Sequence, residues 1–483
     1  MEAACGGRGL CKKCTVVVTG KVCSLETGQT HYADHEPLLA CRFAPIGDCT
    51  VALDAESELS VVTHGAGNIA GSDSEGLGLA VDIGTTTVAV LLYDLGTGER
   101  LASAGERNVQ RGYGADVISR ITACSEGKLP RLRDGIRRQV KAMAERLCRE
   151  TGRDESEICR VAIAGNTVME HLYAGLNPTG IGVAPFTPVS LFGDHWQGML
   201  NEIEAYLCPC VSGYVGGDIT AGLLATGGDK MEGLRLYVDI GTNGEMALGN
   251  RNGYLTCATA AGPAFEGAEI ACGMDGSAGA IDRIVIENGD LAVHVIGDVP
   301  AAGLCGSGLI DGIAALLELG VIDETGRMAD VDELPAHLAS RRFTLKDGST
   351  AFRLMGNVYL AARDVREVQL AKAAIRAGAE TLLAQQGKRP EDITELVIAG
   401  GFGSFLNVNS ALRIGLLPQI DPARIRHVGN AAAFGAALTL QENGAAELTD
   451  FAEKCEYLEL SSSREFMDRY VNCMLFDEQV LEG

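Results

Sequence analysis

Two short segments of the sequence place an aspartate before a Gly-Thr pair, between apolar residues. The first, LAVDIGTTTVAVLL, runs from Leu79 to Leu92, and the second, LYVDIGTNGEMAL, from Leu236 to Leu248. A Gly-Thr turn offers backbone N–H groups and hydroxyls to a phosphate, and a carboxylate beside it can hold Mg²⁺ or its waters. One such segment is a weak signal, because many hairpin turns carry Asp and Gly. Two copies, each opening one half of the chain, predict a pair of phosphate-binding turns.

A second set of chemically capable residues is a group of cysteines near the N-terminus. Cys5, Cys11 and Cys14 lie in CGGRGLCKKC, and Cys41 follows in LLACRF. The glycines between them let backbone N–H groups approach an anionic cluster and tune its potential. Plant-type [2Fe–2S] ferredoxins space their ligands as C-x4-C-x2-C with a distant fourth cysteine. The first gap here is one residue longer, which resembles ferredoxins of the hydroxylase kind, so we predict a [2Fe–2S] cluster on these four residues.

A structural Zn²⁺ site with four cysteines is the alternative for this set. Zinc usually takes two separated C-x2-C pairs, and this stretch has only one. Cys23 and Cys49 lie outside the pattern and are expected to be core thiols, although Cys49 could compete as a ligand.

Composition narrows the class of protein. A chain of 483 residues predicts two or three domains. The net charge of −24 and the pI of about 4.8 argue against binding to nucleic acid and to anionic membrane surfaces. We find neither a long apolar run that could span a membrane nor a signal-peptide core in MEAACGGRG. We therefore expect a cytoplasmic protein whose 16 cysteines are mostly reduced.

The cysteine set requires a small β-rich module, expected over residues 1–53. TVVV (15–18) and CTVAL (49–53) predict strands, and HEPLLAC predicts a short helix that leads to Cys41. A ferredoxin of this type has two strands before its first ligand, whereas four residues precede Cys5. Either the module lacks its first hairpin, or the true start lies upstream of Met1. Residues 54–76, rich in Gly, Ser and acids, predict a flexible linker.

The remaining chain contains one α/β unit twice, over 77–228 and 229–483. VAIAGN (161–166) in the first half matches LVIAGGFGSFLN (396–407) in the second, and both predict a buried strand that ends at glycine. YVGGDITAGLLATG (214–227) predicts a hinge helix, with Asp218 either facing a cleft or capping the helix N-terminus. CGSGLIDGI predicts a helix whose Gly-rich start is an anion site.

The order of these motifs resembles the superfamily of acetate kinase, sugar kinases, Hsp70 and actin. The resemblance implies a ribonuclease H-like, actin-like duplicated ATPase core that closes over ATP and Mg²⁺. Asp82, Asp239, Asp218 and Glu245 would then be the catalytic carboxylates. The remaining nucleotide-binding residues implied by the resemblance are Gly84, Thr85, Thr86, Gly241, Thr242, Asn243, Gly244, Gly306, Ser307, Gly400, Gly401 and Phe402.

A [2Fe–2S] module ahead of such a core resembles the reductive activators of corrinoid proteins. That resemblance rests on CGGRGLCKKC, LLACRF, VDIGTTTV, VDIGTNGE, GPAFEGAEIACGM, CGSGLIDGI, IAGGFGSFLN and the tail EYLELSSSREFMDRYVNCMLF. It implies that ATP hydrolysis is coupled to one-electron reduction of Co(II) corrinoid to Co(I). The implied partners are a corrinoid protein of a methyltransferase system and a low-potential electron donor, and a homodimer is compatible with this function. The family also contains members with an extra middle domain, so the choice of partner does not transfer.

Three other functions fit parts of the same pattern. A small-molecule kinase could use the cluster as a redox sensor. An activator of 2-hydroxyacyl-CoA dehydratases shares the ATPase fold, but it holds a [4Fe–4S] cluster between subunits, which the cysteine spacing does not favour. An ATP-driven conformational switch without catalysis is the third.

Overall fold

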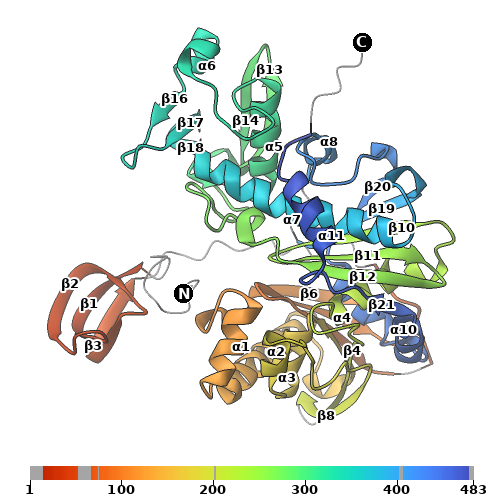
Figure 1. Cartoon of the computed structure of the whole chain (residues 1–483). Helices are drawn as coiled ribbons and strands as arrows, with labels where there is room; N and C mark the ends of the chain where they lie inside the picture. The colour runs from red at the N-terminus through yellow and green to blue at the C-terminus, as the bar shows by residue number, and fades with distance from the viewer. Residues whose placement is uncertain (1–14, 53–66, 74, 201–202, 402–405, 478–483) are drawn as a thin grey trace. The chain divides into compact units, whose positions relative to one another are not determined.

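The computed structural model describes residues 15–52, 67–73, 75–200, 203–401 and 406–477 (Figure 1). Contacts divide the chain into two compact units. Of the described residues, the first contains those within 15–52, 67–221 and 432–449, and the second those within 222–431 and 450–477. Residues 432–449, which the sequence places in the second half, belong to the first unit by this division.

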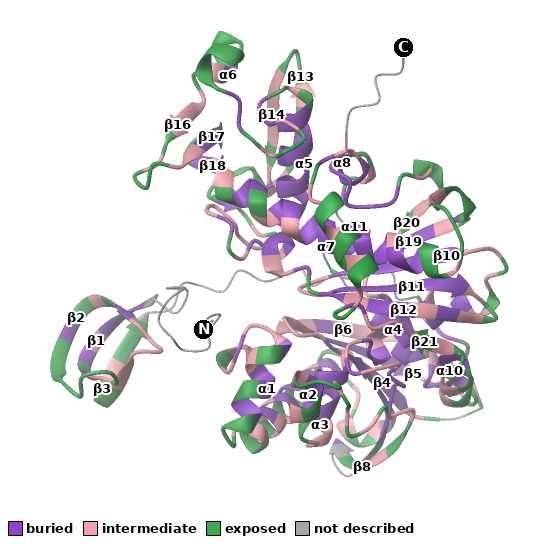
Figure 2. Cartoon of the chain, viewed as in Figure 1, coloured by how far each residue is buried: buried purple, intermediate pink, exposed green. Residues whose placement is uncertain are grey.

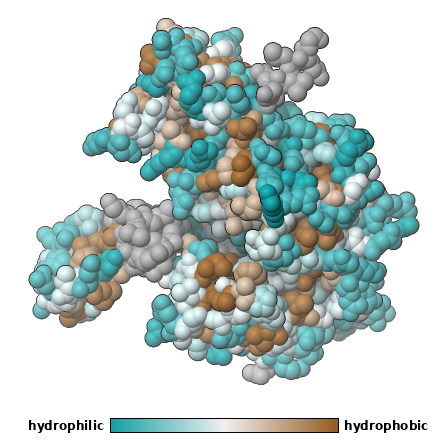
Figure 3. Space-filling model, in the orientation of Figure 1, coloured by the Kyte–Doolittle hydropathy of each residue, from teal (hydrophilic) through white to brown (hydrophobic). Residues whose placement is uncertain are grey.

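Residues 15–52 form a three-stranded antiparallel sheet in the order β2-β1-β3. The strands are β1 (Thr15–Ser24), β2 (Thr30–Leu39) and β3 (Phe43–Ala52). Val16, Val18 and Val22 of β1 are buried with Ala33 and Leu38 of β2. On the opposite face Val17 and Tyr32 are exposed, and Figure 3 shows apolar residues at the surface of this sheet.

The strands predicted at 15–18 and 49–53 are confirmed as parts of β1 and β3. The short helix predicted for HEPLLAC is wrong, because these residues form the end of β2 and the turn after it. Pairing with β1 places Leu38 in the core, which a helix would not do. Pro37, which lacks an N–H, is tolerated because β2 is an edge strand.

The core of the first unit is a six-stranded sheet in the order β6-β5-β4-β7-β9-β8. Its strands are β4 (Leu77–Ile83), β5 (Thr87–Asp94), β6 (Arg100–Arg107), β7 (Ile158–Gly165), β8 (Asp194–Leu200) and β9 (Ile203–Leu207). β4 is antiparallel to β5 and parallel to β7. The helices of this part of the chain are α1 (Val117–Ser125), α2 (Leu129–Thr151), α3 (Thr167–Ala174) and α4 (Gly217–Ala225).

The second unit has a six-stranded sheet in the order β20-β19-β10-β11-β12-β21. Its strands are β10 (Arg235–Ile240), β11 (Gly244–Asn250), β12 (Gly253–Thr259), β19 (Glu395–Ala399), β20 (Ile425–His427) and β21 (Cys455–Tyr457). The smaller sheets contain β13 (Ala280–Glu287), β14 (Asp290–Val295), β15 (Gly303–Leu304), β16 (Arg342–Thr344), β17 (Thr350–Met355) and β18 (Val358–Ala361). The later helices are α5 (Gly306–Glu318), α6 (Ala336–Ala339), α7 (Ala362–Gln385), α8 (Val408–Arg413), α9 (Ala431–Leu438), α10 (Gly444–Ala452) and α11 (Arg464–Asn472).

The two large sheets confirm the predicted duplication. The order β6-β5-β4-β7-β9 in the first sheet corresponds to β12-β11-β10-β19-β20 in the second, and every pairing has the same direction. The long helices also correspond, because α2 packs on β5 and β6 while α7 packs on β11 and β12. Figure 2 shows the buried residues concentrated in these strands and in the helix faces against them.

The end of the segment expected as a linker is packed onto the first unit. The N–H of Ile69 donates to the carbonyl of Gly98, and the hydroxyl of Tyr93 donates to the carbonyl of Gly67. Ile69 itself is buried. Residues 67–72 therefore lie along the β5–β6 hairpin, whereas 53–66 lie outside the described residues. Among the helices that the structure describes, we find none with the length and apolar character needed to cross a membrane.

Gly435 on α9 lies close to the backbone of α4 in the first unit, so a substitution there measures how tightly these helices are packed. A Cβ on Gly435 would lie 2.0 Å from the carbonyl oxygen of Ala221 in α4. Gly435→Ala gains about 1 kcal/mol of helix propensity, but overpacking against backbone costs about 1–3 kcal/mol. We expect a lower thermal unfolding midpoint by circular dichroism. Gly112→Ala is the control, since nothing lies within 4 Å of its Cβ position; an equal loss in both variants would contradict the prediction.

Candidate active site

The first Gly-Thr turn joins β4 to β5, and Asp82 lies at the end of β4. Its neighbours in the sheet are Ala89 on the antiparallel strand and Ala164 on the parallel strand. Both are small, so the partly exposed carboxylate of Asp82 is not crowded by adjacent side chains. The sequence prediction that Asp82 closes a strand before a hairpin turn is confirmed.

Three successive carbonyls of this turn accept hydrogen bonds from residues beneath it. The Asn108 side-chain amide donates to the carbonyl of Gly84 at 2.8 Å, and the backbone N–H of Asn108 donates to that of Thr86 at 2.9 Å. Nη2 of Arg120 donates to the carbonyl of Thr85 at 2.5 Å. In a trans peptide the C=O and the following N–H point in opposite directions. The N–H groups of Thr85 and Thr86 are therefore directed away from this buried layer.

The hydroxyl of Thr85 is oriented by Asn166, the N-cap residue of α3. The Asn166 side chain accepts from the N–H of Met169 and donates from Nδ2 to Oγ1 of Thr85 at 3.0 Å. Because the hydroxyl oxygen accepts this bond, its own proton can be donated to a ligand oxygen. The turn thus has inward carbonyls and a threonine proton available for a phosphate, which fits the ATP that the fold implies.

The second turn follows Asp239 at the end of β10. Asp239 is paired with Glu245 across the antiparallel strand and with Ala399 across the parallel strand. Directly paired residues share one face of a sheet, so the largely buried Glu245 lies on the same face as Asp239. Burial raises the pKa of the Asp239 carboxyl to about 6.

Gly400 approaches Asp239 closely. A Cβ on Gly400 would lie 2.6 Å from Oδ1 of Asp239, and its φ of +89° is one that glycine adopts readily. The structure therefore brings together Asp239 and Gly400, one of the glycines expected to bind the nucleotide. Gly401 is exposed in the turn after β19, and Phe402 lies outside the described residues.

The second turn differs from the first in what supports it. The hydroxyl of Thr242 donates to Oε1 of Glu266 at 2.8 Å, so its proton is already used. The N–H of Gly241 donates to the carbonyl of Asn243, and the hydroxyl of Thr259 donates to the carbonyl of Gly244. A carboxylate therefore contacts this turn where a guanidinium contacts the first.

Asp218 lies in the first turn of α4 beside a buried acid. Its Oδ1 accepts the N–H of Ile219. Glu170 is fully buried, and the thiol of Cys210 donates to its Oε2 at 3.6 Å, while Oε1 has no hydrogen-bond partner among the described residues. A Cβ on Gly217 would lie 2.3 Å from that oxygen. Burial, with the nearby charge of Asp218, raises the pKa of Glu170 well above its ordinary value.

The other predicted site residues have simpler surroundings. Gly306 and Ser307 are buried at the start of α5, where the Ser307 hydroxyl donates to the carbonyl of Asp282. Cys41 follows β2 in a turn, and Cys5, Cys11 and Cys14 lie outside the described residues. The thiol of Cys49 donates to the carbonyl of Lys21 at 3.2 Å.

Sequence reasoning missed the residues that support the first turn. Arg120 occupies the apolar stripe of α1 with Val117, Ile121 and Cys124. A charged residue on the apolar face of a helix is a sign of a buried polar role. Arg120 in α1 and Glu170 among the apolar residues of α3 both show it. Asn108 gives no comparable signal, because it lies between regular elements.

Comparison with known proteins agrees with this architecture. Residues 233–482 match the family model described as the C-terminal domain of RACo, the ASKHA domain, and residues 77–231 match the RACo middle region. The chain is 36% identical to the corrinoid activation enzyme RamQ of Eubacterium limosum, over 84% of this chain and 71% of RamQ. The chain belongs to the RACo family.

Two further relatives support the same assignment. A [Co(II) methylated amine-specific corrinoid protein] reductase of Methanosarcina barkeri is 26% identical over 82% of this chain and 76% of its own length. A solved reductive activator for a corrinoid, iron–sulfur protein is 39% identical with a TM-score of 0.74, and covers 84% of this chain and 67% of its own. The RACo middle region and ASKHA domain each contain one Asp-Ile-Gly-Thr segment of this chain.

The raised pKa of Asp239 predicts the pH dependence of stability of the metal-free RACo chain. The folded state holds a proton on Asp239 up to about pH 6, whereas the unfolded carboxyl loses it near 3.8. This contribution to stability is full below the unfolded pKa and is lost as pH rises through the folded pKa. Asp239→Asn removes the ionisation, so we expect it to raise the unfolding midpoint at about pH 7.5 and to change it little at about pH 4.

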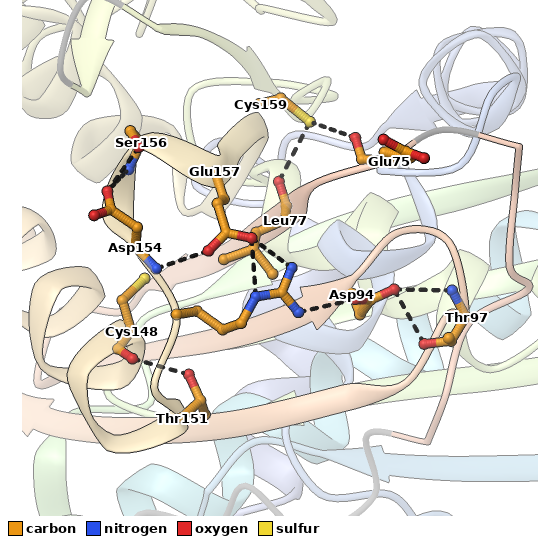
Figure 4. Close-up of polar contacts among 11 residues, drawn as sticks. Glu75, Leu77, Asp94, Thr97, Cys148, Thr151, Asp154, Ser156, Glu157 and Cys159 are labelled. Atoms are coloured by element: carbon orange, nitrogen blue, oxygen red, sulfur yellow. Dashed lines mark hydrogen bonds and ion pairs between the residues drawn. The ribbon is translucent and has the colours of Figure 1, made fainter.

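Asp94→Asn is a control, because its expected effect on the unfolding midpoint at neutral pH is opposite to that of Asp239→Asn (Figure 4). Hydrogen bonds from Thr97, then from Arg153, lower the pKa of Asp94 below its ordinary value. Its contribution is therefore present above the unfolded pKa and lost as pH falls, so this variant should lower the midpoint at neutral pH. If Asp239→Asn instead lowers the unfolding midpoint at neutral pH, burial of the ionised Asp239 carboxylate does not destabilise the folded chain, and the prediction is wrong.

Proposed function

We propose that this chain is an ATP-dependent reductive activator of a corrinoid protein, delivering one electron that converts Co(II) corrinoid to Co(I). The observation that carries the proposal is the preorganised first turn, with three inward carbonyls, in a chain of the RACo family. The relatives named as a corrinoid activation enzyme and a Co(II) corrinoid protein reductase support the substrate class. We place the protein in the cytoplasm, with a low-potential reductant as its electron donor.

The energetics explain why such a reaction uses ATP. A plant-type cluster has a potential of about −400 mV, and the Co(I) state requires a lower one. Each ~59 mV against a one-electron transfer costs a factor of about ten in equilibrium. Nucleotide binding and hydrolysis can offset this cost only by favouring a conformation that differs in its interaction with the corrinoid protein.

The nucleotide-site residues have distinct proposed roles. Asp82 and Asp239 position Mg²⁺ or its waters at the strand ends. The Thr85 hydroxyl donates to a phosphate, whereas Thr242, whose proton is given to Glu266, contributes mainly its backbone. Gly400 keeps the backbone against Asp239, where any side chain would collide. When bound, MgATP supplies the free energy of hydrolysis.

The electron-carrying group is proposed to be a [2Fe–2S] cluster held by Cys5, Cys11, Cys14 and Cys41. The support is the ligand spacing together with the strand arrangement around Cys41, which lies between β2 and β3. When bound by these cysteines, such a cluster would supply the one reversible electron that Co(II) reduction requires.

The cluster predicts a specific metal content. Anaerobically purified or reconstituted protein should be brown, contain two irons and two sulfides per chain, and give a rhombic electron paramagnetic resonance signal on reduction. Cys14→Ser should bleach it without changing ATP binding, measured by calorimetry. One zinc with neither iron nor sulfide would overturn the cluster assignment.

If ATP hydrolysis is coupled to electron transfer, variants of the nucleotide site and of the cluster site should lose different activities. Asp239→Ala should slow ATP-dependent Co(II) reduction by about 10²- to 10³-fold, the range for removing an electrostatic catalytic group, while its cluster remains reducible. Asp82→Ala should behave alike. Cys14→Ser should retain ATPase activity and lose electron delivery. The measurement is the rise of Co(I) absorbance in a corrinoid protein with excess reductant, with and without ATP.

The controls separate this function from the alternatives. Parent protein without ATP gives the uncoupled rate, and the variant clusters are reduced directly to confirm that they accept electrons. If Asp239→Ala reduces the corrinoid as fast as the parent, nucleotide chemistry is not coupled to electron transfer. Steady phosphorylation of a small molecule would then indicate a kinase.

A further inference from the structure

Arg120 is a buried cation, and its hydrogen-bond partners among the described residues are all neutral. Its side chain has no exposed surface. Nε donates to the carbonyl of Gly114 at 3.1 Å, and Nη1 donates to Oε1 of Gln110 at 3.4 Å and to the sulfur of Met169 at 2.9 Å. Nη2 donates to the carbonyl of Thr85. Among the described residues, no carboxylate forms an ion pair with it.

The nearest acidic residue does not neutralise this charge by contact. Asp116 is the N-cap of α1, and its two oxygens accept from the N–H and the hydroxyl of Ser119 at 2.8 and 2.6 Å. Desolvation lowers the pKa of Arg120 to about 9; Asp116 opposes this shift and Arg111 adds to it. The guanidinium therefore remains charged at neutral pH.

A buried ion without a counter-ion is costly and is normally paired or removed. Here the charge lies directly beneath the turn whose Thr85 and Thr86 N–H groups point to the opposite side. A polarised peptide between a cation and an anion strengthens both interactions, because the carbonyl faces the cation and the N–H faces the anion. An anion on the outer side of the turn would supply the missing charge.

We propose that Arg120 is a positioning residue for the nucleotide phosphates: it holds the Thr85 carbonyl inward, and phosphate charge on the outer side of the turn compensates its buried guanidinium through that peptide. The inference rests on the proposed nucleotide site, and it adds that the positive charge of Arg120 favours phosphate binding there. The first turn, supported by a cation, binds phosphate more strongly than the second, whose Thr242 contacts the carboxylate of Glu266.

The test compares ligands with and without phosphate. Arg120→Gln keeps a donor for the Thr85 carbonyl but removes the charge. We expect it to weaken ATP binding by about 10- to 100-fold, the range for losing a charge-assisted interaction, and to leave adenosine binding nearly unchanged. Both affinities are measured by calorimetry or competition, and circular dichroism of the ligand-free protein reports on folding.

Arg137→Gln is the matched control. Arg137 lies on α2, is partly buried, and donates to the carbonyls of Tyr173 and Ala174 at the end of α3 rather than to a phosphate turn. It should not change the ratio of ATP to adenosine affinity. If Arg120→Gln lowers both affinities equally, or lowers the ratio no more than Arg137→Gln does, the proposal is overturned.

A second variant covers the case in which Arg120→Gln does not fold. Arg120→Lys keeps a cation without the planar fork, so it should retain most of the parent's preference for ATP over adenosine. Loss of that preference in folded Arg120→Lys would mean that guanidinium shape rather than charge matters, and would overturn the proposal. If the parent protein itself does not bind ATP, the proposed function fails, which is distinct from failure at Arg120.

Discussion

Every step proposed at the phosphates depends on how the backbone of the first Gly-Thr turn is held. The carbonyls of Gly84, Thr85 and Thr86 are fixed by donors from Asn108 and Arg120, which are themselves buried and bonded. The following N–H groups therefore point away from the protein interior before any ligand arrives. Such preorganisation is effective in binding and catalysis, because no dipole has to be reoriented when the phosphate charge enters.

The duplication preserves backbone topology but not chemistry. Both turns follow an aspartate on a central strand, between one antiparallel and one parallel neighbour. Asp82 has alanines on both sides, whereas Asp239 is paired with Glu245 and approached by the backbone of Gly400. The turns are also supported by opposite charges, Arg120 in one and Glu266 in the other. The two copies of the fold thus differ in the charge and hydrogen bonding of their turns.

Much of this architecture follows from the sequence, because apolar strands that end in Asp-Ile-Gly-Thr, together with helices rich in small residues, are compatible with few folds. The β2 strand was missed because HEPLLAC was interpreted as a short helix, and only its pairing with β1 decides the outcome. Asp82 and Asp239 lie near the ends of the strands that the sequence predicts, and Gly400 lies close to Asp239. Arg120, Asn108 and Asn166 were not found, because their roles depend on contacts between residues distant in sequence. The charged residue in the stripe of α1 was the one visible sign.

α3 connects the first turn to the start of α4 within one unit. At its N-terminus Asn166 holds the Thr85 hydroxyl, and in its first turns Met169 contacts Arg120 while Glu170 lies against Gly217. The close approach of Glu170 to Gly217 leaves no room for a side chain there, and the unpaired Oε1 lies beside the residue before Asp218. A shift of the turn on ligand binding would therefore be accommodated by Asn166 or be passed to α3, whose Glu170 side chain lies against Gly217 at the start of α4. Side-chain contacts of Asn166 with Thr85 and of Glu170 with Gly217 thus join the phosphate turn to the residue before Asp218.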